Sequence, residues 1–400
     1  LSAYSGRDVL MDSLQRRNLI LLALGQGLTG SIISLMTLCS TLVGVSMTPV
    51  PLLTTLPITA TVCGAALMIY SVSSLMTKHG RRNAFIIGTL IGLVGALLAA
   101  LAIALHSFSL FVFSTFVLGM SCAFNQYYRF AAAEIFTDNQ QKNRAISWVI
   151  SGGILGGFLG PFAASQSSQL WASYPFLGSF IAAAFICVIT SLLLLGLKLP
   201  PMSVTTPSAQ RSEPLAAILK SRAFVLGTAS CSVGFVVMTL LMNSVPLAMH
   251  QHHFSVSHSA TVLQWHFVAM YAPALLLVLL AKRLTPVQVV VIGMVCNVVG
   301  VAVALSGLTF WHFLFALMLF GIGWAFMFNG GTFMLNAFTH SVHKSRLQGI
   351  NSLVIYVPNA LASLSAGSLM ALTSGWSLVN MVGIGMLLLL VLGLIVLGRR

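Results

Sequence analysis

A positive charge inside an apolar segment is the first feature of this sequence that could do chemistry. Arg129 stands in an apolar run over about 108–136, in the stretch Gln-Tyr-Tyr-Arg-Phe at 126–130. A guanidinium keeps its proton in proteins, so inside a bilayer it needs polar partners or water. Such cations usually face a bundle interior or an aqueous cavity, and the alternative is a structural arginine that holds a neighbouring helix end.

Other polar and aromatic residues stand at similar positions in their own apolar runs. Arg129 is about eight residues, or about 12 Å, from one end of its run. Amides at a comparable depth would favour an anionic or hydrogen-bonding solute, and aromatic rings would stack on a planar one. For each aromatic residue, ordinary helix packing is the alternative. The predicted substrate-binding residues are Arg129, Gln126, Asn125, Tyr127, Gln26, Asn329, Trp265, His266 and Tyr356.

Two titratable residues are candidates for proton coupling. Glu134 is the one acidic residue of five that borders an apolar run. It fits a gate partner, a plain surface carboxylate or a proton carrier. His266 has an ordinary pKa within the physiological range, so it can titrate there. The alternative is a neutral histidine bonded to a neighbouring helix, and transport without protons also stays open.

The sequence offers few residues arranged for enzyme catalysis or metal binding. Four histidines, at 250, 252, 253 and 258, lie close together without a metal-binding spacing, and the six cysteines all fall in apolar runs. Nucleophile–base pairs and phosphate-binding loops are not apparent in the sequence. We therefore expect no enzymatic activity, no cofactor and no bound metal.

Composition places the chain in a membrane. Hydrophobic residues make up 58% of the 400 and charged residues 6%, which is far from a soluble domain. The net charge of +14 comes from basic residues scattered singly, not from a stripe that would bind nucleic acid. The expected partners are a small-molecule solute and the lipid bilayer, with protons as a further candidate, and we expect a monomer.

Twelve apolar runs are long enough to cross a bilayer as helices. The proline-rich stretch between the sixth and seventh divides the chain into an N-terminal six-helix bundle (1–197), a linker (198–221) and a C-terminal six-helix bundle (222–400). The runs lie at about 18–46, 51–77, 83–105, 108–136, 144–166, 174–197, 222–249, 257–281, 285–306, 309–337, 346–373 and 376–398.

Basic residues predict the orientation of the twelve spans. Apart from Arg129, all of the nineteen lysines and arginines fall in the two tails and the even-numbered connections. Cytoplasmic loops carry the excess of such residues, so both termini are expected in the cytoplasm of a bacterial inner membrane.

The two halves also resemble each other at an offset of 204 residues. Phe124-Asn125 matches Phe328-Asn329, and Lys78 matches Lys282. Because each half has an even number of spans, the repeats run parallel, and a substrate site is expected between them near mid-membrane.

This organisation resembles the major facilitator superfamily. The stretch 73–82, ending in Lys-His-Gly-Arg-Arg, is similar to the family signature between helices two and three, with Ser73 and Thr77 in place of the usual Gly and Asp. Gly156-Gly157-Phe-Leu-Gly160-Pro161 resembles an antiporter motif without its downstream glycines. The stretches 126–134 and 264–273 look like a bacterial branch that includes riboflavin transporters.

The resemblance implies an all-α fold, with twelve transmembrane helices in two pseudo-symmetric six-helix bundles around a cavity lined by helices one, four, seven and ten. It also implies a gate in which the acidic residue after helix four pairs with basic residues. The predicted gating residues are Glu134, Lys78, Arg81, Arg82 and Arg346.

We therefore expect a secondary active transporter, a symporter or antiporter, that moves a small anionic or polar-aromatic solute such as a vitamin, metabolite or siderophore by alternating access. A proton-antiport exporter of drugs or metabolites is the first alternative, and a non-transporting receptor on the same fold is the second.

Overall fold

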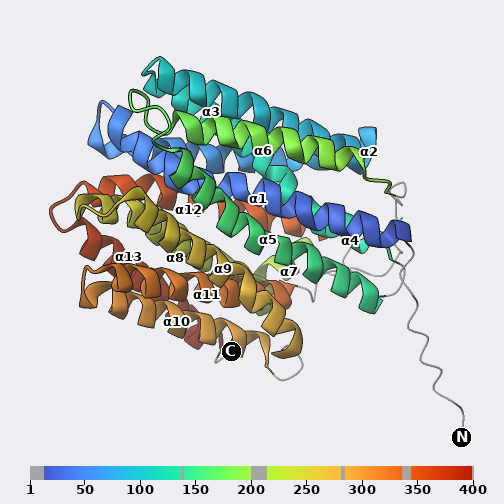
Figure 1. Cartoon of the computed structure of the whole chain (residues 1–400). Helices are drawn as coiled ribbons and strands as arrows, with labels where there is room; N and C mark the ends of the chain where they lie inside the picture. The colour runs from blue at the N-terminus through green and yellow to red at the C-terminus, as the bar shows by residue number, and fades with distance from the viewer. Residues whose placement is uncertain (1–12, 137–138, 200–213, 281–283, 336–343, 399–400) are drawn as a thin grey trace, which may run out of the picture.

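The computed structural model describes residues 13–136, 139–199, 214–280, 284–335 and 344–398, where all regular structure is helical. The long helices lie side by side along one direction (Figure 1). The elements are α1 (Ser13–Met47), η1 (Pro51–Leu53), α2 (Leu56–Ala104), α3 (Phe108–Cys122), η2 (Ala123–Tyr127), α4 (Tyr128–Ala133), α5 (Asn139–Ser167), α6 (Leu177–Leu195), α7 (Leu215–Lys220), α8 (Arg222–Gln251), α9 (Val256–Leu280), α10 (Pro286–Ser306), α11 (Phe310–Leu335), α12 (Lys344–Met370) and α13 (Gly375–Gly398).

The helices confirm the predicted membrane spans. Among the described residues, eleven segments are long and apolar enough to cross a bilayer. The remaining predicted run corresponds to α9, whose 25 residues give a length of about 37 Å. That exceeds the roughly 30 Å of bilayer hydrocarbon. The chain is therefore an all-α, twelve-span membrane protein built from two six-helix bundles, while the bundle boundaries at 197 and 222 stay a prediction.

Two predicted spans meet without a loop at Gly80. The second and third runs form one continuous element, α2, whose backbone leaves the helical region at Gly80, with φ 76° and ψ 158°. L-residues with a side chain rarely adopt a positive φ, so glycine suits this position. A single glycine therefore reverses the chain, and it places the basic residues on either side of it at the tip of the turn.

The fourth span differs from the uninterrupted helix that the apolar run predicts. It consists of α3, then five residues of 3₁₀ helix in η2, then the short α4. A 3₁₀ stretch has three residues per turn instead of 3.6, so it rotates the side chains that follow it. Arg129 is the second residue of α4, and its direction is set directly after this change of pitch.

Helix α5 uses glycines on two faces. On one face a Cβ at Gly152 or Gly156 would lie within 2.5 Å of a backbone oxygen of α1. On the other face a Cβ at Gly157 would lie 2.5 Å from the Cβ of Phe267 in α9. Small residues allow such close approach of membrane helices. The glycine-rich segment therefore packs α5 between α1 and α9, and it joins the two halves.

At one end of the molecule the two halves are hydrogen-bonded together. The hydroxyl of Thr55, just before α2, donates to the carbonyl of Leu364 in α12 at 3.1 Å and accepts from the N–H of Gly367 at 3.1 Å. One turn further, Thr59 donates to the hydroxyl of Ser363 at 3.1 Å. We call this the Thr55 end, and we call the opposite end, where α1 begins, the Arg17 end.

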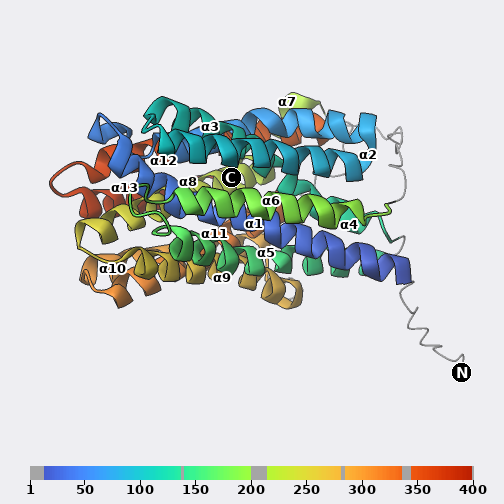
Figure 2. The same cartoon turned by 45° about the horizontal axis from the view of Figure 1, so that its top comes forward.

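The buried clusters show that the halves separate toward the Arg17 end. The largest cluster combines residues of both halves, and from α1 it draws only on Ile32–Val43, the part near the Thr55 end. A second cluster, from Leu19 to Leu197, contains buried residues of the first half alone. A third, around Phe224, contains residues of α7, α8, α11 and α12 alone. The described residues therefore form a buried cluster shared by the halves toward the Thr55 end, and separate clusters in each half toward the Arg17 end. Figure 2 shows the same helices from a second side.

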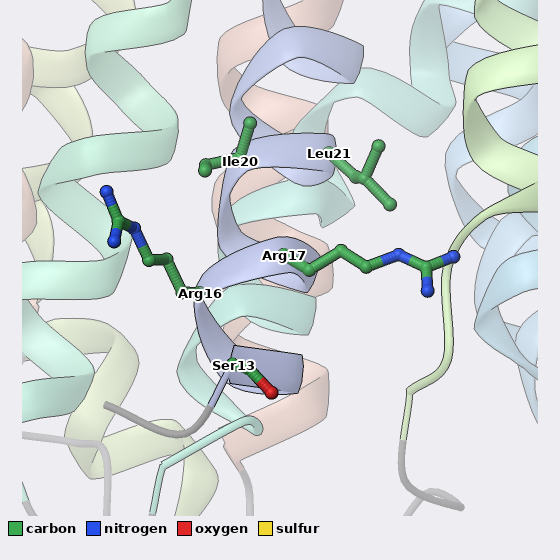
Figure 3. Close-up of a pocket in the computed structure, with 5 residues that line it drawn as sticks. All are labelled: Ser13, Arg16, Arg17, Ile20 and Leu21. Carbon is green, nitrogen blue, oxygen red and sulfur yellow. The ribbon is translucent and has the colours of Figure 1, made fainter. Parts of the chain in front are cut away.

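Two polar side chains of α1, Arg17 and Asn18, bond to the end of α6 and the residues after it at the Arg17 end. Arg17 donates to the carbonyl of Gly196 at the end of α6, at 2.8 Å, and Arg16 points away from it on the other side of α1 (Figure 3). Asn18 donates to the carbonyl of Lys198 at 2.7 Å. Cations favour the carbonyl-rich C-terminus of a helix, so these contacts stabilise the end of α6.

Candidate functional site

Arg129 is a half-buried cation without a protein counter-ion among the described residues. Its Nε is buried and makes no hydrogen bond, and its side chain forms no ion pair or hydrogen bond within the described residues. Its one close ring contact is the neighbouring Phe130, whose centroid is 4.9 Å from the guanidinium carbon. A charge that is partly removed from water without a partner is costly, so this arrangement is the first sign of a binding position.

Two polar groups of the other half lie within electrostatic range of Arg129. Its guanidinium interacts electrostatically with the phenols of Tyr356 in α12 and Tyr271 in α9. The ring of Tyr271 also packs on α5, where a Cβ at Gly153 would approach it to 3.0 Å. One cation from the first half and two phenols from the second are thus close enough to interact electrostatically across the interface.

An aromatic cluster of the second half lies at the same level. Phe235 of α8 meets Trp324 and Phe328 of α11 edge-on, at 5.2 and 5.3 Å between ring centroids, and the latter two stack. Ser232, one turn before Phe235, donates to the carbonyl of Val354 in α12 at 2.7 Å. Since Tyr356 is two residues beyond Val354, the aromatic cluster and Tyr356 share a depth in the bundle.

The other predicted residues near Arg129 have mixed environments. Asn125 is buried with an unpaired Oδ1, and its Nδ2 would lie 3.6 Å from a Cβ at Gly30 of α1. Gln26 is half-buried in α1, whereas Gln126 is exposed. Tyr127 donates its hydroxyl to the carbonyl of Ile69 in α2 at 3.0 Å, so this hydroxyl has a protein partner.

Two further predicted residues are engaged away from Arg129. The amide of Asn329 donates to the carbonyl of Ala325 in its own helix at 2.7 Å. Trp265 is exposed and meets Phe158 of α5 edge-on, at 5.9 Å between ring centroids, and the adjacent Gln264 donates to the Phe158 carbonyl. The contacts of Trp265 and Gln264 belong to helix packing between α5 and α9.

His266 is enclosed between two helices of the second half. The side chain is 0% exposed, and Nδ1 lies 2.7 Å from the carbonyl oxygen of Leu317 in α11. A carbonyl can only accept, so Nδ1 carries the proton, and the buried Nε2 has no partner. This geometry matches the alternative of a neutral histidine bonded to a neighbouring helix.

Glu134 pairs with Arg81, one of the four basic residues predicted for the gate. Arg81 donates from Nε to one carboxylate oxygen of Glu134 at 2.7 Å and from its terminal nitrogen to the other. Arg81 is 8% exposed and Glu134 is 37% exposed. Both residues belong to the first half, so the pair ties the Gly80 turn to the end of α4.

The remaining predicted gating residues do not join this pair. Lys78 and Arg82 are exposed, and Arg82 donates to the side chain of Asn83 at 3.4 Å. Arg346 belongs to α12, and the prediction about its side chain lies outside the described residues.

Tyr271 is the residue of this arrangement that sequence reasoning missed. It stands in the middle of an apolar run, where a phenol differs from its neighbours by one hydroxyl. Its position relative to Arg129 depends on the packing of α5 against α9, which joins residues more than a hundred positions apart.

Comparisons with known proteins agree on one family. The profile of the Major Facilitator Superfamily matches residues 18–272. The riboflavin transporter RfnT of Brucella anthropi is 34% identical over 91% of this chain and 92% of its own length. The MFS-type transporter YdeG of Bacillus subtilis is 25% identical over 100% of this chain and 96% of its own length.

Solved structures share the fold at low identity. The nucleoside transporter NupG superposes with a TM-score of 0.69 at 14% identity, covering 97% of this chain and 100% of its own. The xylose transporter XylE of E. coli, in a partially occluded inward-open conformation, superposes with a TM-score of 0.69 at 12% identity, covering 94% and 98%.

Proposed function

Because this chain belongs to the major facilitator superfamily, we propose that it is a secondary transporter for a small polar-aromatic solute, riboflavin or a related flavin. The substrate class draws support from the 34% identity with a riboflavin transporter. The observation that carries the proposal is the unpaired guanidinium nitrogen of Arg129, within electrostatic range of Tyr271 and Tyr356 of the opposite half. Groups held by both halves can close around one solute and release it when the halves separate.

The chemistry of the site fits a solute with a planar ring and a polar chain. Trp324, Phe235 and Phe328 offer aromatic surface at the depth of Tyr356. The guanidinium and the two phenols offer hydrogen bonds on the facing side of the interface. A flavin has both parts, an extended ring with carbonyl acceptors and a hydroxylated chain.

Alternating access follows from the two ends. The Arg17 end carries the basic residues that the positive-inside rule assigns to the cytoplasm, so we place it there in a bacterial inner membrane. With the Thr55 end closed, this conformation faces the cytoplasm. Opening the Thr55 end and packing the halves together at the Arg17 end would present the site to the outside.

Uptake of labelled riboflavin into proteoliposomes tests the proposal. We expect saturable uptake by the wild type and its loss in Arg129→Ala, with little rescue by Arg129→Lys because the planar fork is lost. Arg16→Ala is the matched control, since Arg16 is an exposed cation of the same half. Uptake in the Arg129→Ala variant equal to that of the control would refute the role of Arg129.

Direction can be read in the same vesicles. Transport driven into or out of the lumen by an imposed gradient distinguishes import from export, and the absence of flux for every flavin would exclude the proposed substrate class.

A further inference from the structure

The charge on Arg129 is not balanced by any carboxylate that the sequence places in the membrane. The chain has only five acidic residues, and four of them stand in the tail, the short connection and the linker that are predicted to lie outside the spans. The fifth, Glu134, accepts hydrogen bonds from Arg81 with both of its carboxylate oxygens. The protein therefore carries a permanent positive charge at the interface of its halves.

The neutral neighbours cannot cancel that charge. Tyr271 and Tyr356 are phenols, which donate or accept hydrogen bonds but stay uncharged at neutral pH. The buried Nε of Arg129 lacks even a hydrogen-bond acceptor. A cation held in this way is stabilised most by a negative charge close to it.

We infer that the site between the halves binds an anion at Arg129. The anion is either an acidic group of the solute or a free inorganic ion that enters with a neutral solute. A guanidinium forms two parallel hydrogen bonds with a carboxylate or phosphate, and a phenol can donate a further bond to the same group. The inference rests on the proposed function in one respect, that this anion site is the transport site.

Binding of two flavins to the full-length protein separates the two sources of the anion. Riboflavin is neutral, and its 5′-phosphate adds an anionic group to the same ring and chain. The affinity of the protein for each flavin is measured by titration calorimetry in two buffers. One contains chloride, and the other contains a sulfonate anion too bulky for the site. If the solute supplies the anion, riboflavin 5′-phosphate binds about tenfold tighter than riboflavin, or more, in both salts. If a free ion supplies the anion, riboflavin binds about tenfold tighter in the chloride salt than in the sulfonate salt.

Either preference should disappear in Arg129→Gln and persist in Arg16→Gln, because Arg16 is an exposed cation of the same half and serves as the matched control. Since Arg129→Gln can fail to fold, Tyr356→Phe is a second variant. It keeps the charge and removes one donor, so we expect a weakened preference. Equal affinities for both flavins in both salts would overturn the inference.

A test without flavins keeps the inference separate from the proposed function. Chloride or inorganic phosphate alone should raise the melting temperature of the wild type, and should do so less in Tyr356→Phe. If neither flavin binds but this anion effect is present, the substrate proposal fails and the anion site stands. If flavins are transported but neither anions nor the phosphate group have an effect, the anion site fails and the transport function stands.

Discussion

Replacing Thr55 with valine should open the Thr55 end. Valine has the shape of threonine without its hydroxyl, so the packing stays and two hydrogen bonds between the halves are lost, to Leu364 and from Gly367. Each such bond contributes about 0.5–1.5 kcal/mol net, so the closed state should lose about 1–3 kcal/mol. The ratio of open to closed molecules at this end should then rise by about 5- to 150-fold.

The direction of this shift follows from where the bonds are made. Both bonds join the first half to α12, and both must break when the halves separate at this end. In the open state water can take the place of either partner, so the substitution costs little there. The closed state alone is destabilised.

Distances between spin labels on opposite halves measure the fraction of molecules that are open at the Thr55 end. Val50 and Leu372 are exposed near the Thr55 end, one on each half, and the six free cysteines are replaced first. Thr61→Val is the matched control, because Thr61 is a buried threonine of α2 whose hydroxyl bonds to Pro57 in its own helix at 3.2 Å. The long-distance population should grow in Thr55→Val alone. An equal change in both variants, or in neither, would refute a latch at this end.

Three further substitutions test other contacts. Glu134→Gln leaves the buried Arg81 without its carboxylate. We expect the free energy of unfolding to fall by about 1–3 kcal/mol, after allowance for the exposed side of Glu134. An unchanged melting temperature would contradict this. His266→Gln should lower the melting temperature, and any response of uptake to a pH gradient should remain because the ring is enclosed. If a fully stable variant lost that response, the result would instead support proton transfer by His266. Gly157→Ala should destabilise the protein much more than Gly393→Ala, whose Cβ would meet nothing within 4 Å, and equal melting temperatures would refute close packing of α5 on α9.

The sequence by itself determined the membrane fold and its most unusual residue. Runs of about twenty apolar residues have few alternatives to spanning helices, because a bilayer leaves no other way to bond the backbone. The same rule isolates Arg129, since one cation among apolar neighbours is visible without any structure. The partnership of Glu134 with a basic residue of the Gly80 turn was one of the pairings expected from the family resemblance.

Only the tertiary structure decided which faces of these helices meet. The spans are apolar nearly all round, so periodicity does not distinguish a face toward lipid from one toward another helix. Thus His266 and Trp265 are adjacent in sequence, yet one is enclosed against α11 and the other is exposed beside α5. The approach of Tyr271 and Tyr356 to Arg129, and the closure at the Thr55 end, depend on contacts between distant segments, which local sequence patterns do not encode.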